Sequence, residues 1–194
     1  MANPRKSRIR IIGGKWRGRK IEVIEAEGLR PTPDRIRETL FNWLAPVCPG
    51  AMVLDCFAGS GALGLEALSR GAKMLVALEQ HPSALENLRL QAQKLEVAAI
   101  DVIGGDALAS IARLQQKFDL VFIDPPYARP ELRHQVLRQL EAQGSLQAGA
   151  RLYFEWPSPE VFELPGADFH WLKQKVAGQV NYAIAEWRPG DEAD

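Results

Sequence analysis

Short apolar runs alternate along this chain with segments whose apolar residues recur at helical spacing. The runs are rich in Val, Leu and Ile, which is typical of strands buried on both faces of a parallel sheet; they occupy residues 52–56, 74–79, 99–103, 119–124 and 150–155. Helical spacing follows at residues 62–70 and 107–116 and after Pro82 and Pro130. This alternation predicts an α/β fold in which helices cover a mostly parallel sheet.

The last part of the chain departs from this alternation. Residues 157–166 are rich in proline and show no helical stripe. The runs 171–176 and 180–187 flank Ala177-Gly178, which is a hairpin signal. We therefore expect the parallel units to be followed by a terminal antiparallel pair of strands.

A further helix is expected over residues 34–45, before the first buried strand. Thr32 is a suitable N-cap and Pro33 suits the first helical position. The apolar stripe of this helix comprises Ile36, Leu40, Trp43 and Leu44. Arg35 and Arg37 lie off that stripe, a position typical of a solvated helix face.

The first 28 residues combine strand-like alternation with positive charge. Alternating residues on both sides of Gly13-Gly14 predict a β-hairpin over residues 8–24. Residues 1–20 contain eight basic residues and no acidic one, so the remainder of this neutral chain carries a net charge of −8. We expect residues 1–28 to form a basic arm that binds a polyanion, attached to a body at 29–194; a solubilising tail is the alternative. Trp16, at the expected tip, could stack on a base or cover the body.

Composition narrows the class of protein. No apolar run approaches the length of a membrane span, and the first residues lack the apolar segment of a secretory signal. Cys48 and Cys56 do not form a ligand-like pair, and the three histidines are far apart in the sequence. We expect a reduced, cytoplasmic, monomeric protein without a bound metal.

A glycine-rich segment follows the first buried strand. Gly59-Ser60-Gly61-Ala62-Leu63-Gly64 satisfies the dinucleotide pattern G-x-G-x-x-G, and Glu79 ends the next strand, where an acid can accept ribose hydroxyls. An NAD-dependent oxidoreductase is therefore one interpretation. The pattern on its own does not choose between NAD and another nucleoside cofactor.

Carboxylates at successive strand ends favour a cationic cofactor. Asp55, Glu79, Asp106 and Asp124 each end, or closely follow, one of four consecutive strands. An acidic crevice would repel a pyrophosphate and attract the sulfonium and amino groups of S-adenosylmethionine. Helix capping is the structural alternative for such acids. The expected cofactor-binding residues are Asp55, Phe57, Gly59, Gly61, Glu79, Asp106 and Asp124.

Asp124-Pro125-Pro126-Tyr127 directly follows a buried apolar run and carries the candidate chemistry. Two prolines stiffen the strand exit because each fixes φ. The Asp124 carboxylate and the Pro125 carbonyl can accept the two hydrogens of an exocyclic amine, and the Tyr127 ring can stack on the base that bears it. We expect these three residues to be catalytic, with the base taken out of its stack.

With these motifs placed, the chain resembles the class I S-adenosylmethionine-dependent methyltransferases, and more closely the bacterial RsmD-like family that methylates guanine N2 in 16S ribosomal RNA. The segments that carry the resemblance are Arg8–Gly14 with Arg17-Gly18, Arg30–Pro33 with Arg35–Asn42, Leu54–Gly61, and Asp124–Tyr127. The last of these is shared with enzymes that methylate adenine N6 in DNA, so a DNA methyltransferase remains an alternative, as does a non-catalytic RNA-binding module.

The resemblance implies a Rossmann-like, seven-stranded sheet whose last strand runs antiparallel. It also implies S-adenosylmethionine as cofactor, and 16S ribosomal RNA, in a small ribosomal subunit or an assembly intermediate, as partner. The residues expected to contact RNA are Arg8, Arg10, Lys15, Trp16, Arg17 and Arg19 of the arm, together with Arg35 and Arg37.

Overall fold

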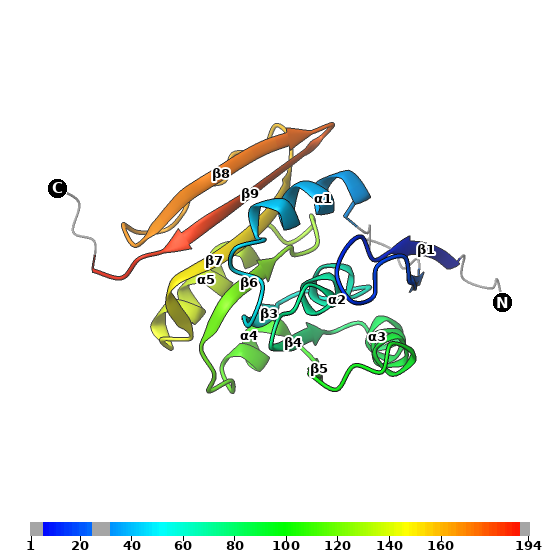
Figure 1. Ribbon diagram of the computed structural model, residues 1–194. Helices are drawn as coiled ribbons and strands as arrows, with labels where there is room; N and C mark the ends of the chain where they lie inside the picture. The colour runs from blue at the N-terminus through cyan, green and yellow to red at the C-terminus, as the bar shows by residue number, and fades with distance from the viewer. Residues whose placement is uncertain (1–5, 25–31, 191–194) are drawn as a thin grey trace.

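The computed structural model describes residues 6–24 and 32–190. A seven-stranded sheet forms its centre, with strand order β5-β4-β3-β6-β7-β9-β8 (Figure 1). The strands are β3 (Met52–Asp55), β4 (Met74–Glu79), β5 (Ile100–Gly104), β6 (Phe118–Ile123), β7 (Leu146–Pro157), β8 (Phe169–Ala177) and β9 (Val180–Trp187). The helices are α1 (Asp34–Trp43), α2 (Ala62–Ser69), α3 (Pro82–Lys94), α4 (Ala107–Ile111) and α5 (Leu132–Ala142).

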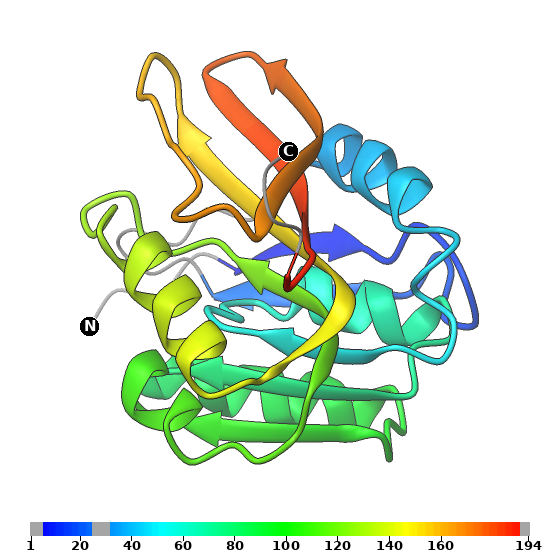
Figure 2. The same cartoon turned by 90° about the vertical axis from the view of Figure 1, so that its left-hand side faces the viewer.

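The strand directions confirm the expected topology. Strands β5, β4, β3, β6 and β7 are paired in parallel, and β9 runs antiparallel to both β7 and β8. The last strand of the chain is therefore the antiparallel one, as the resemblance implied. Because the five parallel strands point the same way, their carboxyl ends share one edge of the sheet (Figure 2).

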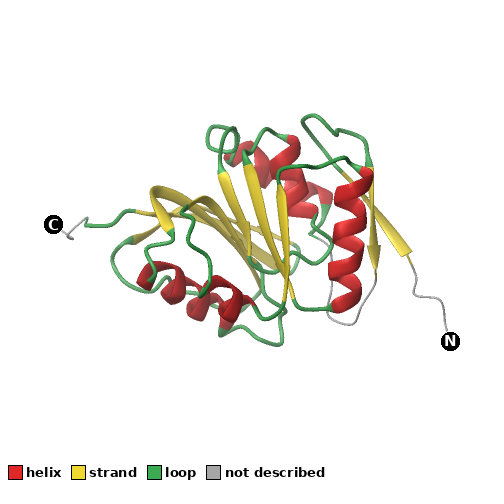
Figure 3. Cartoon of the chain, turned by 90° about the horizontal axis from the view of Figure 1, so that it is seen from below, coloured by secondary structure: helices red, strands yellow, loops and turns green. Residues whose placement is uncertain are grey.

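Helices cover both faces of this sheet (Figure 3). Successive residues of a strand point to opposite faces, so each strand feeds two separate cores. In β6, Leu120 and Phe122 join the core under α1, α2 and α3, whereas Val121 and Ile123 join the core under α4 and α5. This two-sided burial explains why the strands read as continuous apolar runs. Within the described residues, no helix combines the length and apolar character needed to cross a membrane.

Several boundaries differ from the prediction. Helix α4 ends at Ile111 instead of residue 116, because hydrogen bonds from Arg113 to Ser110 and from Leu114 to Ile111 tighten the chain into a turn before β6. The N-cap of α1 is Pro33, without a side-chain cap. Thr32, the predicted N-cap, instead donates a hydrogen bond from its buried side chain to Glu155.

The predicted N-terminal hairpin is present as β1 (Lys6–Arg10) and β2 (Lys20–Ile24), paired antiparallel. Its inward side is part of the core, since Ile11 and Ile21 are fully buried and Val23 is 3% exposed. The described part of the arm is therefore built into the body. The predicted boundary at residue 28 and the start of the linker after it lie outside the described residues.

A buried carboxylate on α2 fixes the hairpin. Glu66 is fully buried and accepts hydrogen bonds from the backbone N–H groups of Ile12 (2.7 Å) and Gly13 (2.8 Å). The Arg70 guanidinium lies 2.7 Å from the same carboxylate, and that of Arg37 lies 3.7 Å away. The two guanidinium charges and the two hydrogen bonds together offset the cost of removing the Glu66 carboxylate from water.

Arg37 belongs to the same network. Its side chain is fully buried, where it bonds the Asp34 carboxylate at 2.6 Å and the Arg10 carbonyl at 2.8 Å. It thus has no surface with which to contact RNA, in contrast to the sequence-based expectation. We replace that assignment with a structural one, in which Arg37 ties α1 to the hairpin.

The loop of the hairpin lies directly on the end of α2. Gly14 has φ +76°, and a Cβ there would lie 1.8 Å from the Ser69 carbonyl oxygen, so only glycine fits. The next two amides, of Lys15 and Trp16, donate to the Ser69 carbonyl (2.7 Å) and hydroxyl (2.9 Å). Trp16 is half-buried against the core, which favours the covering role over base stacking.

We expect Glu66→Ala to lower the free energy of unfolding by about 3–5 kcal/mol, because it leaves the buried Arg37 cation without one of its partners and two hairpin amides unpaired. Urea unfolding of the full chain measures this change. Glu38→Ala, on the exposed side of α1, is the matched control and should stay within about 0.5 kcal/mol of the parent. A loss below about 1 kcal/mol for Glu66→Ala would contradict the role given to this carboxylate.

Candidate active site

Four carboxylates lie at or near the carboxyl ends of four adjacent parallel strands. In the order of the sheet they are Glu79 on β4, Asp55 on β3, Asp124 after β6 and Glu155 on β7. All four line one cavity of about 390 Å³ at the carboxyl edge of the sheet. The crevice that the α/β pattern predicted is therefore present, and its floor is acidic.

The glycine-rich segment forms one wall of this cavity. Phe57, Gly59 and Ser60 line it. Gly61 does not line it; with φ +78° it is the N-cap of α2, and a Cβ there would meet Leu88 Cδ1 at 2.3 Å. Gly61 was predicted to bind the cofactor; in the structure it lets the loop approach α3, so that the loop can turn tightly beside the cavity.

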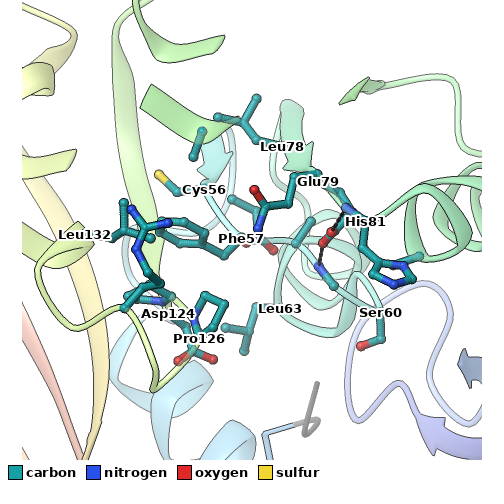
Figure 4. Close-up of a pocket in the computed structure, with 18 of the residues that line it drawn as sticks. Cys56, Phe57, Ser60, Leu63, Leu78, Glu79, His81, Asp124, Pro126 and Leu132 are labelled. Atoms are coloured by element: carbon teal, nitrogen blue, oxygen red, sulfur yellow. Dashed lines mark hydrogen bonds between the residues drawn. The ribbon is translucent and has the colours of Figure 1, made fainter. Parts of the chain in front are cut away.

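Glu79 holds the loop on which the cofactor would rest. Its carboxylate accepts hydrogen bonds from the backbone N–H groups of Gly59 (2.7 Å) and His81 (2.6 Å). Figure 4 shows Glu79, His81 and Ser60 on one side of the cavity, and Asp124, Pro126 and Leu132 on the other. Each carboxylate oxygen keeps acceptor capacity for a ribose hydroxyl, as predicted for Glu79.

Asp55 lies in the middle of the row and is 4% exposed. Burial raises the pKa of this carboxyl to about 7, with a smaller contribution from the Glu79 charge, against hydrogen bonds from the backbone of Phe57 and Gly64. Burial opposes the ionisation of this carboxyl, so a cation bound beside it would stabilise the ionised form strongly.

Asp106 caps a helix, which is the alternative role given above for acids at strand ends. It is exposed, and its carboxylate caps α4 by accepting a hydrogen bond from the Ala109 N–H at 3.0 Å. It also lines the cavity. Capping therefore engages one carboxylate oxygen of Asp106, whereas Glu79 accepts hydrogen bonds from the loop amides of Gly59 and His81.

The segment Asp124–Tyr127 forms the wall opposite the glycine loop. Burial raises the pKa of the Asp124 carboxyl well above its usual range, and the charges of Glu155 and Asp55 raise it further, against Arg133. Tyr127 is 46% exposed at the same cavity. The three predicted catalytic residues are thus brought together, with a carboxylate inside and an aromatic ring at the mouth.

Glu155 is the site residue that the sequence analysis missed. It is 4% exposed and receives hydrogen bonds from the Tyr153 hydroxyl (2.6 Å) and the Thr32 side chain. The rule applied to the other four strand ends would have found it, because Glu155 ends the fifth predicted run. Other lining residues that the sequence analysis did not name lie in or after predicted strands; they include Cys56, Ser60, His81, Pro126 and Leu132.

The residues predicted to contact RNA separate into two groups. Those exposed on the hairpin and on α1 are Arg8, Arg10, Lys15, Arg17, Arg19 and Arg35. Trp16 and Arg37, as described above, face the body. The hairpin also reaches the cavity, because Val23 of β2 lines it and the Asn87 side chain donates to the Glu22 carbonyl at 2.8 Å.

Comparison with known proteins identifies the family. The family model described as "Conserved hypothetical protein 95" matches residues 9–186. The chain belongs to this family. The resemblance drawn from the four sequence segments is thereby confirmed, since members of the family include proteins named as ribosomal RNA methyltransferases.

Two relatives in the family are similar over almost their whole length. The Ribosomal RNA small subunit methyltransferase D of Escherichia coli strain K12 is 44% identical over 188 residues, which is 96% of this chain and 93% of the relative. The protein of the same name from Haemophilus influenzae is 40% identical over 183 residues, 92% of this chain and 94% of the relative.

A solved family structure shares the fold. The protein yhhF from Escherichia coli superposes with a TM-score of 0.87 at 40% identity, over 94% of this chain and 99% of that one. These similarities confirm the Rossmann-like methyltransferase fold and the enzyme class. They favour S-adenosylmethionine over NAD as cofactor.

The residues present fit S-adenosylmethionine. Buried Asp55 and Glu79 offer carboxylate oxygens to a ligand that carries a sulfonium, an amino group and ribose hydroxyls, while Phe57, Leu63 and Leu78 offer apolar surface. Such a donor set would not suit a pyrophosphate. Among the described residues, no group of His, Cys, Asp or Glu side chains could hold a metal ion.

We expect the affinity for S-adenosylmethionine to rise by about tenfold between pH 6 and pH 8. Asp55 ionises as the pH rises through about 7, and only its ionised form attracts the cationic ligand. Titration calorimetry in two buffers of different ionisation enthalpy should show proton release near pH 6 and almost none at pH 8.

Asp55→Asn should bind more weakly and lose most of this pH dependence, whereas Asp124→Asn should keep it. An unchanged pH dependence in Asp55→Asn would assign the titration to another carboxyl of the row.

Proposed function

We propose that this protein transfers a methyl group from S-adenosylmethionine to the exocyclic N2 amine of a guanine in 16S ribosomal RNA. The observation that carries the proposal is the carboxylate row, in which Asp124 with its two following prolines lies beside the cofactor half of the cavity. The names of the two relatives support ribosomal RNA as the substrate.

The chain's own groups hold the reacting amine. An aromatic amine is a weak nucleophile because its lone pair is delocalised into the ring. The Asp124 carboxylate and the Pro125 carbonyl each accept a hydrogen bond from one of the two N–H groups of this amine, and so concentrate the lone pair on nitrogen. Positive charge grows on that nitrogen during transfer, so both acceptors stabilise the transition state more than the ground state.

The remaining groups position the reactants. Tyr127, at the mouth of the cavity, stacks on the extruded base. Glu79, Asp55 and Asp106 hold the cofactor, which supplies an electrophilic methyl group when bound. Strands β3 and β6 are neighbours, and Asp55 pairs with Phe122, two residues before Asp124, which supports a site whose two halves meet at these strand ends. Such alignment supplies a large part of the rate enhancement.

The exposed cations of the hairpin lie on a strand pair that also contributes to this cavity. Arg8 lies opposite Glu22, one residue before the cavity-lining Val23, and further cations follow along the hairpin and at Arg35 of α1. We infer that the RNA backbone runs along this surface while the target base enters the cavity. In this proposal a monomer acts on the RNA of the small ribosomal subunit or of an assembly intermediate.

We expect Asp124→Ala to reduce turnover by about 100-fold or more, since it removes one acceptor of the transition state. Its affinity for S-adenosylhomocysteine should change little, because Glu79 and the glycine loop are untouched. Transfer of a tritiated methyl group to 16S RNA, or to small-subunit particles, from cells lacking the protein measures turnover.

Asp101→Ala, an exposed Asp of β5 outside the cavity, is the control and should retain full activity. Normal turnover by Asp124→Ala would refute the base-holding role. Duplex DNA methylated in preference to ribosomal RNA by the parent protein would refute the proposed substrate.

Reversal of the hairpin charges should weaken RNA binding and its salt dependence. In Arg8→Glu/Arg10→Glu/Arg17→Glu, we expect the slope of log affinity against log salt to become less steep by about 2–3. Filter binding over a salt series measures both quantities. Point substitutions are needed because deletion of residues 1–20 would also remove buried Ile11 and the partners of Glu66.

The control is Arg113→Glu/Lys117→Glu/Arg138→Glu, which changes the net charge equally at exposed positions outside the hairpin and α1. It should alter the affinity far less. Equal effects from the two triple variants would mean that only net charge matters, and that the hairpin is no dedicated RNA surface.

A further inference from the structure

We propose that Glu155 determines the base specificity of the enzyme by accepting the N1–H of the guanine whose N2 amine is methylated. This inference rests on the function proposed above and adds a residue to it. Asp124 and Pro125 alone would accept the amine hydrogens of any base that carries an exocyclic amine, so they do not explain a preference for guanine.

The chemistry of the bases makes a second acceptor decisive. Beside its exocyclic amine, guanine carries a hydrogen on the ring nitrogen N1. Adenine at N1 and cytosine at N3 carry a lone pair at the corresponding position. A fixed carboxylate there would accept from guanine and would oppose the lone pair of the other two bases. Sites built around such a polar contact reject the analogue that lacks it.

The sheet places Glu155 beside Asp124. Ile123 of β6 pairs with Phe154 of β7, so Asp124 and Glu155 follow on neighbouring parallel strands. Both line the cavity. Asp55 and Glu79 lie on the other side of Asp124 in the order of the sheet, so Glu155 flanks the half of the cavity that the cofactor does not need.

Neighbouring groups hold the Glu155 carboxylate in place. The Tyr153 hydroxyl donates to its Oε1 at 2.6 Å, and Thr32 donates from the segment before α1. Arg133 of α5 donates to the Glu155 backbone carbonyl at 3.5 Å and pairs with Glu160. A carboxylate can accept more bonds than these. A held acceptor needs little reorganisation when a base arrives.

The test compares two bases at the methylated position. Small-subunit particles are reconstituted with 16S RNA that carries either guanine or 2-aminopurine at that nucleotide. 2-Aminopurine keeps the exocyclic amine but has a lone pair at N1. For the parent protein, we expect kcat/KM for guanine to exceed that for 2-aminopurine by at least about 100-fold.

Glu155→Gln should reduce this ratio to below about tenfold, because its amide can donate to the N1 lone pair. Tyr153→Phe removes a hydrogen bond to Glu155 but keeps its carboxylate, so it should retain most of the discrimination between the two bases. This variant therefore distinguishes contact of Glu155 with the base from a purely structural role at the strand end. Glu155→Asp keeps the charge but moves the carboxylate away from the base, because the side chain is shorter. It should therefore also lower the ratio of kcat/KM for guanine to that for 2-aminopurine. Affinity for S-adenosylhomocysteine should be unchanged in all three variants.

If Glu155→Gln and Glu155→Asp both keep the parental ratio, Asp124 alone reads the base and the inference is overturned. That outcome would leave the proposed function intact, because the parent would still methylate guanine particles. Absence of methylation of guanine particles by the parent protein would instead overturn the proposed function itself.

Discussion

Mutual repulsion among carboxylates at one buried edge is the constraint on which the site depends. Parallel strands β3, β6 and β7 end side by side, so Asp55, Asp124 and Glu155 are forced together. Burial and like charge raise the pKa of Asp55 and Asp124. A cation on one side and N–H donors on the other would relieve this repulsion. The arrangement therefore favours a cationic cofactor and an amine-bearing base together.

Another buried carboxylate connects this site to the basic hairpin, the proposed RNA-binding surface. Glu66 lies on α2, the helix that begins at the glycine loop. Its carboxylate accepts hydrogen bonds from two backbone N–H groups of the basic hairpin. Val23 of the same hairpin lines the cavity. The hairpin thus contributes Val23 to the wall of the cavity and also displays exposed cations.

Local pattern predicted the fold and most of the strand-end site, because two-sided burial makes each parallel strand a continuous apolar run. The sequence pattern failed where contacts between residues far apart in the chain determine the position of a side chain. Arg37 looked solvated in its own helix, but it is fully buried, where it bonds the Arg10 carbonyl and pairs with Glu66 on another helix. Thr32 looked like a cap, but its side chain bonds Glu155 instead. Glu155 was missed although it ends the fifth predicted run, and the pairing of β7 with β6 shows that it lies beside Asp124.

The most direct measurement of the central claim is a map of N2-methylguanosine in 16S ribosomal RNA from cells that lack this protein. One such nucleotide should be missing, should return with the parent chain, and should stay missing with Asp124→Ala, although that variant still binds S-adenosylhomocysteine. An unchanged map in the deletion strain, or full restoration by Asp124→Ala, would contradict the account.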